Sequence, residues 1–216
     1  MTSVAVVLDF DGTLANTADA VVDTVTRTLA ELKGPATDSA TVVQCMGLPL
    51  RETFLRLGVI DPVRLDEAVL CYRRRFQDAQ RLIRLFSGVS DVLRALHEQK
   101  VPLAIASSRG RESLISLVRH LGIETWVSVV LGEEDVLAAK PAPDAVYRVA
   151  QQIGVSAADV LVVGDTSYDI EMGKAAGART CGVSYGSHSR SVLAAAAPTY
   201  LIDSFDQLPG VVHDVR

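Results

Sequence analysis

Short apolar runs alternate with helical patterns along most of this chain, and this alternation limits its possible folds more than any other feature. Six runs are typical of buried strands: residues 4–9, 102–107, 127–131, 159–164, 179–183 and 199–202. Helical patterns separate most of them, over residues 91–99, 111–121, 144–153 and 168–176. Strands that alternate with helices form βαβ units, so the sequence predicts an α/β fold with a parallel sheet and helices on both of its faces.

Residues 15–87 have a different pattern. They contain no convincing strand and are typical of four helices, over residues 17–32, 39–45, 50–57 and 62–86. Glycine and proline at Gly34-Pro35, Met46-Gly47-Leu48-Pro49 and Gly58 separate these helices. The sequence therefore predicts a helical domain over residues 15–87, inserted into a main domain formed by residues 1–14 and 88–216. Hinges are expected near residues 15–16 and 87–88.

Polar residues follow the apolar runs at the positions where the predicted strands end. Asp9 and Asp11 follow the first run, Ser107 and Ser108 the second, and Asp165 and Asp169 the fourth, while Lys140 precedes a proline-rich turn. Ligands of open α/β sheets bind outside the carboxyl ends of the strands. We therefore expect these side chains to meet in one crevice, although they are far apart in the sequence.

The two aspartates after the first run share a direction if the strand geometry persists past Leu8. Two carboxylates placed together repel each other, and they are tolerated where a cation compensates them or where one of them keeps its proton. Carboxylates suit Mg²⁺, which also binds phosphate oxygens. The pattern Asp-x-Asp-Gly-Thr is therefore a candidate magnesium and phosphate site, and its alternative is an ordinary turn at the end of a strand.

The four motifs, in this order, resemble those of the haloacid dehalogenase-like superfamily of aspartate-nucleophile phosphotransferases. The resemblance covers essentially the whole chain. The helical insertion and Gly47-Leu48-Pro49-Leu50-Arg51-Glu52-Thr53 are most similar to its phosphoglycolate phosphatase-like branch, which belongs to subfamily I with a helical C1 cap. This resemblance implies a Rossmann-like core and a cap, residues 15–87, that closes over the site.

The resemblance also implies a role for each matching residue. Asp9 is expected to be the nucleophile, Asp11 the general acid and base, and Lys140 the cation that stabilises both Asp9 and the transferring phosphoryl group. Ser107 is expected to donate a hydrogen bond to a phosphoryl oxygen, and the N–H of Ser108 to add a second. The implied ligands of the metal, Mg²⁺, are Asp9, Asp11 through its backbone carbonyl, Asp165 and Asp169.

Two further residues are weaker candidates for binding substrate. Thr13 is expected to lie beside the nucleophile, where its hydroxyl supports Asp11, and Arg51 is expected to reach a distal anionic group of the substrate. Simpler alternatives exist for several of these residues: the two serines could cap the following helix, Lys140 could be an exposed loop lysine, and Arg51 could be a solvated helix residue. The arginines at 73–75, 81 and 84 are typical of a charged helix face.

These features predict a Mg²⁺-dependent phosphatase that hydrolyses a small phosphate monoester, such as phosphoglycolate or a biosynthetic intermediate, through an aspartyl-phosphate. A sugar phosphomutase similar to β-phosphoglucomutase and a pyrophosphatase remain open, because both retain the same aspartates. A dehalogenase is disfavoured because such enzymes lack the second aspartate. A non-catalytic binding protein is disfavoured because Asp9, Asp11, Lys140 and Asp165 are all intact.

Composition excludes several classes of partner. A net charge of −5 gives no general electrostatic attraction to nucleic acid or to an anionic membrane, and no run approaches the roughly 20 apolar residues of a membrane span. Three cysteines without metal-binding spacing are typical of a reduced compartment, so a cytoplasmic protein is expected. The expected partner is a small phosphate ester, with no nucleic acid and no membrane, and the chain is expected to be a monomer or a homodimer.

Overall fold

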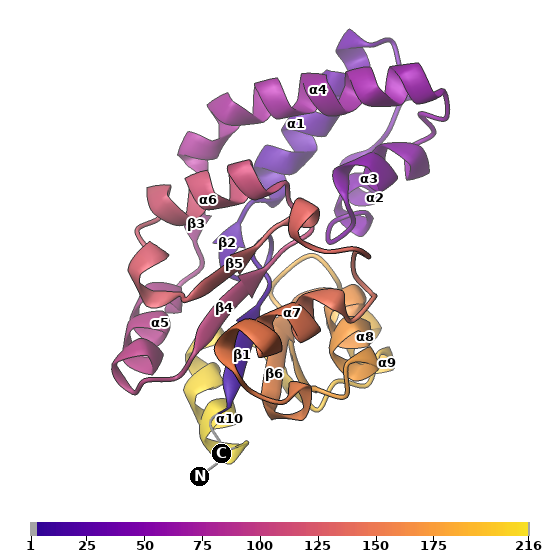
Figure 1. The fold of residues 1–216 in the computed structure, drawn as a ribbon. Helices are drawn as coiled ribbons and strands as arrows, with labels where there is room; N and C mark the ends of the chain where they lie inside the picture. The colour runs from indigo at the N-terminus through magenta and orange to yellow at the C-terminus, as the bar shows by residue number, and fades with distance from the viewer. Residues whose placement is uncertain (1–3, 216) are drawn as a thin grey trace.

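The computed structural model describes residues 4–215 and is built around one six-stranded parallel sheet (Figure 1). Its strands are β1 (Ala5–Leu8), β4 (Leu103–Ala106), β5 (Val129–Leu131), β6 (Val160–Gly164), β7 (Arg179–Val183) and β8 (Tyr200–Ile202). They lie in the order β5-β4-β1-β6-β7-β8, and each neighbouring pair is parallel. The predicted α/β fold is confirmed. Residues 1–3 and 216 of the predicted main domain lie outside the described residues.

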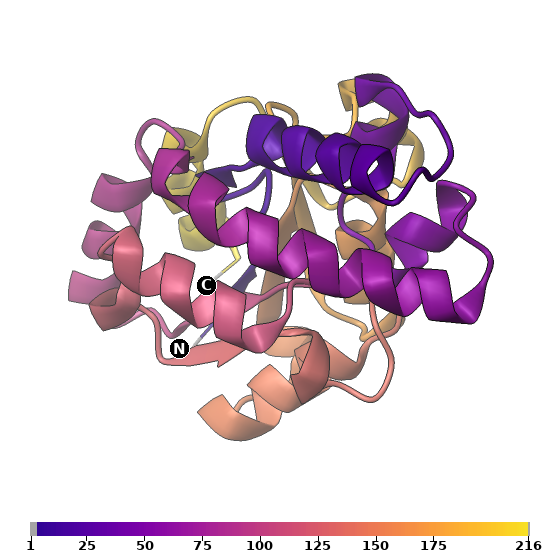
Figure 2. The same cartoon turned by 90° about the horizontal axis from the view of Figure 1, so that it is seen from above.

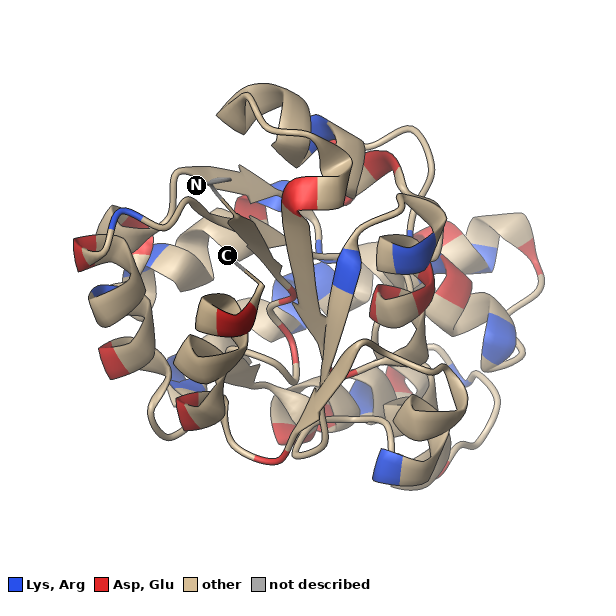
Figure 3. Ribbon diagram, turned by 90° about the horizontal axis from the view of Figure 1, so that it is seen from below, with Lys and Arg blue, Asp and Glu red and all other residues tan. Residues whose placement is uncertain are grey.

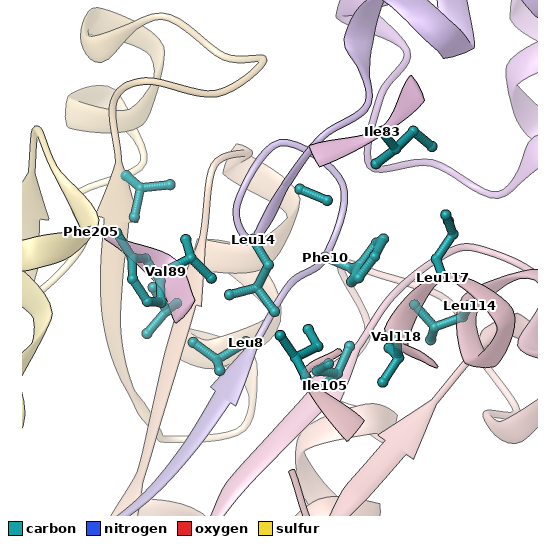
Figure 4. Packing of buried hydrophobic residues seen from close by; sticks show 14 of the residues in the cluster. Leu8, Phe10, Leu14, Ile83, Val89, Ile105, Leu114, Leu117, Val118 and Phe205 are labelled. Atoms are coloured by element: carbon teal, nitrogen blue, oxygen red, sulfur yellow. The ribbon is translucent and has the colours of Figure 1, made fainter. Parts of the chain in front are cut away.

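Helices cover both faces of the sheet, as expected. Successive side chains of a strand point to opposite faces: Val6 and Leu8 join one buried cluster, whereas Ala5 and Val7 join another. The first cluster includes residues of α5 (Val89–Glu98), α6 (Arg111–His120) and α10 (Leu208–Asp214), and Figure 4 shows its centre around Leu8. The second includes residues of α7 (Asp144–Ile153) and α8 (Ser167–Ala175). The short helix α10 was not predicted, and of α9 (Arg190–Ala195) only a helix end at residues 194–197 was anticipated.

A two-stranded antiparallel ladder marks the point at which the chain leaves the sheet and returns to it. Its strands are β2 (Ala15–Asn16) and β3 (Arg84–Leu85). Two expectations were therefore wrong: residues 15–87 do contain strands, and the last predicted helix does not reach residue 86. Strands of two residues are too short to show an alternating pattern, and no glycine or proline announces the end of that helix.

Four helices lie between the two short strands, above the end of the sheet in Figure 1: α1 (Ala18–Glu31), α2 (Ser39–Gln44), α3 (Leu50–Arg56) and α4 (Pro62–Ala79). Figure 2 shows α1 and α4 side by side. The rings of Phe54, Tyr72 and Phe76 join α3 to α4, with centroids 6.2 and 5.5 Å apart along the row. Residues 17–83 are called the helical insertion below; their independence as a domain stays a prediction.

The outer surface carries both signs of charge. Acidic and basic residues are interspersed over the helices in Figure 3, with neither sign gathered on the face shown. Among residues 4–215, no helix combines the length and the apolar character needed to cross a bilayer.

Candidate active site

The order of the strands brings three of the four motifs together. β1 pairs with β4 on one side and with β6 on the other. Asp9 and Asp11 follow β1, Ser107 follows β4, and Asp165 follows β6, all at the same edge of the sheet. The crevice predicted from the sequence is therefore located where strand order reverses around β1, which is the position at which open α/β sheets bind ligands.

Three carboxylates meet at this edge around one lysine. Asp9, Asp165 and Asp169 each place one carboxylate oxygen within 4.8 Å of the others, and all three side chains are buried. Lys140 Nζ donates to Asp9 Oδ1 at 2.5 Å and to Asp169 Oδ1 at 2.6 Å. The side chain of Lys140 is only 4% exposed, so the alternative of an exposed loop lysine is wrong. We refer to these four residues as the acidic cluster.

The acidic cluster carries more negative charge than its lysine can balance. Burial raises the pKa of Asp9 well above its usual value, and the carboxylates of Asp169 and Asp165 add to this rise against the opposing effect of Lys140. Burial and the charge of Asp169 raise the pKa of Asp165 to about 6. Burial acts to lower the pKa of Lys140, but its two carboxylate partners outweigh burial and keep the ammonium protonated. With all three carboxyls ionised, one ammonium would leave two formal negative charges, and the raised pKa values of Asp9 and Asp165 are the response to this imbalance.

Hydrogen bonds from the surrounding loops orient two of these carboxylates. The N–H and hydroxyl of Thr166 donate to Asp169 Oδ2, at 3.1 and 2.7 Å. Asp165 accepts from the hydroxyl of Thr13 at 2.9 Å and from the N–H of Ser187 at 2.6 Å. Thr13 therefore supports Asp165 and not Asp11, which corrects the expectation from the sequence.

Gly12 lets the turn after β1 approach Asp165 closely. Its φ of +86° is a conformation that residues with a Cβ rarely adopt, and an added Cβ would lie 2.2 Å from Asp165 Oδ2. The glycine between Asp11 and Thr13 is therefore required by the geometry of the acidic cluster.

The carboxylate of Asp11 lies apart from the acidic cluster and pairs with Arg109. Arg109 donates from Nε to Asp11 Oδ2 at 3.0 Å and from Nη2 to Asp11 Oδ1 at 2.6 Å. Burial acts to raise the pKa of Asp11, but the guanidinium of Arg109 outweighs burial and lowers it. Asp11 is therefore ionised in this arrangement. Whether Asp11 binds a metal through its backbone carbonyl stays a prediction.

Sequence reasoning missed Arg109. The arginine directly follows Ser107-Ser108 at the end of a predicted strand, and this position was the only signal that it belonged to the site. The direction of a long side chain and its partner across the crevice cannot be read from that position. In the structure its side chain is 8% exposed, and its Cζ lies 4.2 Å from the ring centroid of Phe76 in α4.

The two serines after β4 do not cap the next helix. α6 begins at Arg111 with Gly110 at its N-cap, so the capping alternative is wrong. The hydroxyl of Ser107 accepts from the N–H of Arg109 at 3.2 Å. Ser108 donates from its hydroxyl to the carbonyl of Gly47 at 2.7 Å, which joins the loop after β4 to the helical insertion.

A cavity of about 510 Å³ separates this edge of the sheet from the helical insertion. Asp9, Asp11, Ser107, Ser108 and Arg109 line it from one side. Residues of the insertion line it from the other, among them Val25, Met46, Tyr72, Arg73, Phe76 and Arg81.

Arg51 is not among the residues that line this cavity. Its guanidinium pairs with Asp66 of α4 and is about half exposed. Thr13, Lys140, Asp165 and Asp169 lie outside the lining as well. The expected contact between Arg51 and substrate stays a prediction, and the arginine that faces both the cavity and Asp11 is Arg109.

Comparison with known proteins agrees with this geometry. The family model described as "Haloacid dehalogenase-like hydrolase" matches residues 6–183. The chain is 31% identical to "Phosphoglycolate phosphatase, plasmid" of Cupriavidus necator, over 98% of this chain and 94% of that protein. It is 29% identical to "Pyrophosphatase PpaX" of Halalkalibacterium halodurans, over 96% and 95% respectively. The crystal structure of a predicted phosphoglycolate phosphatase from Haemophilus somnus 129pt has the same fold, with a TM-score of 0.91, 21% identity and coverage of 98% of this chain and 99% of that one.

Proposed function

Because this chain belongs to the haloacid dehalogenase-like hydrolase family and is a phosphatase by that membership and by its relatives, we propose that it hydrolyses a small phosphate monoester through an aspartyl-phosphate at Asp9. One observation carries the proposal. The buried carboxylate of Asp9 lines the cavity, and the ammonium of Lys140 bonds to it from outside the cavity lining. In this arrangement Asp9 can attack a phosphoryl group that lies in the cavity, while Lys140 partly balances its negative charge from outside the cavity lining.

The proposed reaction has two steps. A carboxylate oxygen of Asp9 attacks phosphorus while the bond from phosphorus to the ester oxygen breaks. Asp11, which is ionised while it is paired with Arg109, takes up a proton from water once that pairing opens and gives this proton to the leaving oxygen. Asp11 then accepts a proton from a water molecule, which attacks the phosphorus of the aspartyl-phosphate and releases phosphate and the free Asp9 carboxylate. Ser107 and Ser108 lie beside the same cavity and are proposed to hold phosphoryl oxygens.

The acidic cluster supports a magnesium site. Its donors are all carboxylate oxygens, which hard divalent cations prefer, and with all three carboxyls ionised the two negative charges that Lys140 leaves unbalanced would match one Mg²⁺. Asp9, Asp165 and Asp169 would hold the ion, which would offset the charge between Asp9 and a phosphate dianion. The cytoplasmic location and the predicted oligomeric states stay predictions.

Mg²⁺ is expected to raise the melting temperature of the metal-free protein more at pH 7.5 than at pH 5. The folded-state pKa of Asp165 is raised to about 6, so the stability associated with its protonated form is lost as the pH rises through that value. Mg²⁺ competes with that proton, and saturation at a hundredfold above its Kd stabilises the fold by about 2.7 kcal/mol. Thermal unfolding with and without Mg²⁺ at both pH values measures this difference.

Asp165→Asn is expected to reduce this Mg²⁺-induced shift, because it removes one ligand of the cluster. Asp23→Asn is the matched control, since Asp23 is an exposed aspartate of α1 that pairs with Arg27. Equal Mg²⁺-induced shifts of the melting temperature in Asp165→Asn and in the unmodified protein would contradict the assignment of Asp165 as a ligand.

Two relatives suggest which substrates to examine first. The names of the Cupriavidus and Halalkalibacterium proteins specify phosphoglycolate and pyrophosphate. A cavity of about 510 Å³ supports a small substrate of either kind. Pyrophosphate hydrolysis is therefore kept as the second candidate function, on the strength of that relative.

The proposed function is tested by phosphate release from phosphoglycolate, hexose phosphates, nucleotides, pyrophosphate and aryl phosphates, each with Mg²⁺ and with EDTA. We expect Mg²⁺-dependent release, and the preferred compound then identifies the substrate class. Absence of release from all of them would contradict the proposal, and conversion of β-glucose 1-phosphate would then support the mutase alternative.

A further inference from the structure

The pairing of Arg109 with Asp11 blocks the proton donation of the proposed reaction. Nε and Nη2 of Arg109 donate to the two oxygens of the Asp11 carboxylate, at 3.0 and 2.6 Å, and this contact keeps Asp11 ionised. An ionised carboxylate has no proton to give to a leaving oxygen. The contact is therefore a resting arrangement, and it has to open before Asp11 can act as the acid.

A buried guanidinium needs another anion before it releases Asp11. The side chain of Arg109 is 8% exposed and that of Asp11 is 16% exposed. Separation of such a pair leaves a charge that is shielded from water and unpaired, which is costly unless a new anion replaces the lost one. Arg109 lines the cavity, so an anion that a bound substrate carries can take that place.

Contacts other than Asp11 hold the guanidinium in position. Nη1 of Arg109 donates to the hydroxyl of Ser113 in α6 at 3.2 Å, and Cζ lies 4.2 Å from the ring centroid of Phe76 in α4. When Asp11 leaves, Nε and Nη2 therefore stay directed toward the space that its carboxylate occupied. The planar fork of these two donors matches two oxygens of a carboxylate or of a phosphoryl group.

Arg73 and Arg81 also line the cavity, but neither is enclosed in this way. Both are exposed, and Arg73 pairs with Glu134 at 3.7 Å. An exposed cation attracts an anion weakly, because water and salt screen the interaction. Among these three arginines, Arg109 is therefore the one that can select a substrate by its charge.

The site of the second anion lies close to the nucleophile. Asp9 and Asp11 are two residues apart, so their Cα atoms lie within about 7 Å of each other, and both residues line the cavity. A short molecule can therefore place one phosphoryl group at Asp9 and a second anionic group at Arg109. The cavity of about 510 Å³ has room for such a molecule.

We propose that Arg109 is a specificity-determining residue: a second anionic group of the substrate takes the guanidinium from Asp11, and the freed Asp11 then takes up the proton that it gives to the leaving oxygen. The substrate is accordingly a phosphate compound that carries a carboxylate or another phosphoryl group a few bonds from the transferred phosphorus. A substrate without a second anion leaves the pair closed and reacts slowly. The inference rests on the proposed function, because it concerns the choice of substrate for that reaction.

The first test compares two esters that differ in one charge. Phosphoglycolate has a carboxylate where 2-hydroxyethyl phosphate has a neutral hydroxymethyl group, and the unmodified protein is expected to show the higher kcat/KM for phosphoglycolate. Arg109→Gln is expected to lower kcat/KM for phosphoglycolate about thirtyfold, because it removes a two-pronged, charge-assisted contact. The same variant is expected to raise kcat/KM for 2-hydroxyethyl phosphate about threefold, because Asp11 is no longer held in its ionised form.

The second test opens the pair without a mutation. Sodium acetate supplies a free carboxylate, so it is expected to raise kcat/KM of the unmodified protein for 2-hydroxyethyl phosphate about threefold, whereas sodium chloride at the same ionic strength is not. For phosphoglycolate, acetate is expected to compete with the carboxylate of the substrate and to lower kcat/KM. Arg109→Gln should show neither effect of acetate, because its binding site for the carboxylate is lost.

Arg119→Gln is the control, since Arg119 is an exposed arginine at the end of α6 that pairs with Glu124. It should leave kcat/KM for both esters and both effects of acetate unchanged. If pyrophosphate is the better substrate of the unmodified protein, it replaces phosphoglycolate in each comparison, since it carries a second phosphoryl group.

Three results would overturn the inference and leave the proposed function standing. Equal losses for the two esters in Arg109→Gln would place the guanidinium on the phosphoryl group that both share. Absence of activation by acetate would show that a carboxylate does not open the pair, and this measurement does not depend on the folding of any variant. An equal kcat/KM of the unmodified protein for the charged and the neutral substrate would show no selection by charge. No Mg²⁺-dependent release of phosphate from any of these compounds would overturn both proposals.

Discussion

Replacement of Asp9 by asparagine is expected to lower phosphate release from every ester by at least about a thousandfold while the protein stays folded. The amide is nearly the same size as the carboxylate but cannot attack phosphorus. The measurement is phosphate release by Asp9→Asn and by the unmodified protein, both with Mg²⁺. Activity within tenfold of the unmodified protein would contradict the assignment of Asp9 as nucleophile.

The same substitution is expected to leave the metal-free fold at least as stable as before. Burial and two acidic neighbours raise the pKa of Asp9 well above its usual value, so its ionised form costs stability at neutral pH. Asparagine removes that cost, and Lys140 keeps its bond to Asp169. Thermal unfolding of Asp9→Asn in EDTA at pH 7.5, with the exposed Asp23→Asn as control, distinguishes loss of chemistry from loss of fold.

Replacement of Lys140 by methionine is expected to destabilise the metal-free protein by about 3–5 kcal/mol at pH 7.5, because it leaves buried carboxylates without their cation. The ammonium bonds to both Asp9 and Asp169, and its side chain is 4% exposed. The pKa of Lys140 is raised in the fold, so the contribution of its ammonium to the free energy of unfolding is fully present at and below neutral pH. Denaturant unfolding of the variant and of the unmodified protein measures the difference.

Two comparisons test the physical cause of this destabilisation. The loss should be smaller at pH 5 than at pH 7.5, since protonated carboxyls no longer need a cation. Adding Asp169→Asn to Lys140→Met should restore part of the lost stability, because it removes one of the unpaired charges. Lys174→Met, at an exposed lysine of α8 that donates to the carbonyl of Ala196, should change stability little. Equal unfolding free energies for Lys140→Met and the unmodified protein would show that the carboxylates are balanced by some other means.

The two substitutions separate charge from chemistry within one hydrogen-bonded pair. Both are expected to abolish catalysis, yet Asp9→Asn relieves the negative charge of the acidic cluster whereas Lys140→Met increases it. Without metal, Asp9→Asn is therefore expected to leave the protein at least as stable as before, and Lys140→Met to destabilise it. This difference would show that the charges of the site lower the stability of the fold. Such a cost is common where groups are arranged for catalysis and not for stability.

Several features of the site could be predicted from the sequence, and they share one physical reason. Short apolar runs are typical of the strands of a parallel sheet, and parallel strands all end at one edge, so the residues after β1, β4 and β6 must lie near one another. Asp9, Ser107 and Asp165 follow those strands, and their convergence needed no knowledge of side-chain contacts. The place of Lys140 in the site was expected only from the motif, because no strand directly precedes it.

Other features could not be predicted, because they depend on contacts between segments that are remote in the sequence. The strands β2 and β3 of the short ladder have two residues each, so neither can show an alternating hydrophobic pattern in the sequence. Arg51 was expected near substrate, but Asp66 pairs with its guanidinium instead.

The sequence by itself determined the sheet, the edge at which the site lies and the residue types gathered there, because hydrophobic periodicity and parallel strand order are properties of the chain. Only the tertiary structure decided which carboxylate belongs to which cation. Lys140 pairs with Asp9 and Asp169, and Arg109 pairs with Asp11. The reason is that charge and burial select the partner of each flexible side chain within the crevice. This crevice exists only after the sheet has formed and the helical insertion lies over its edge.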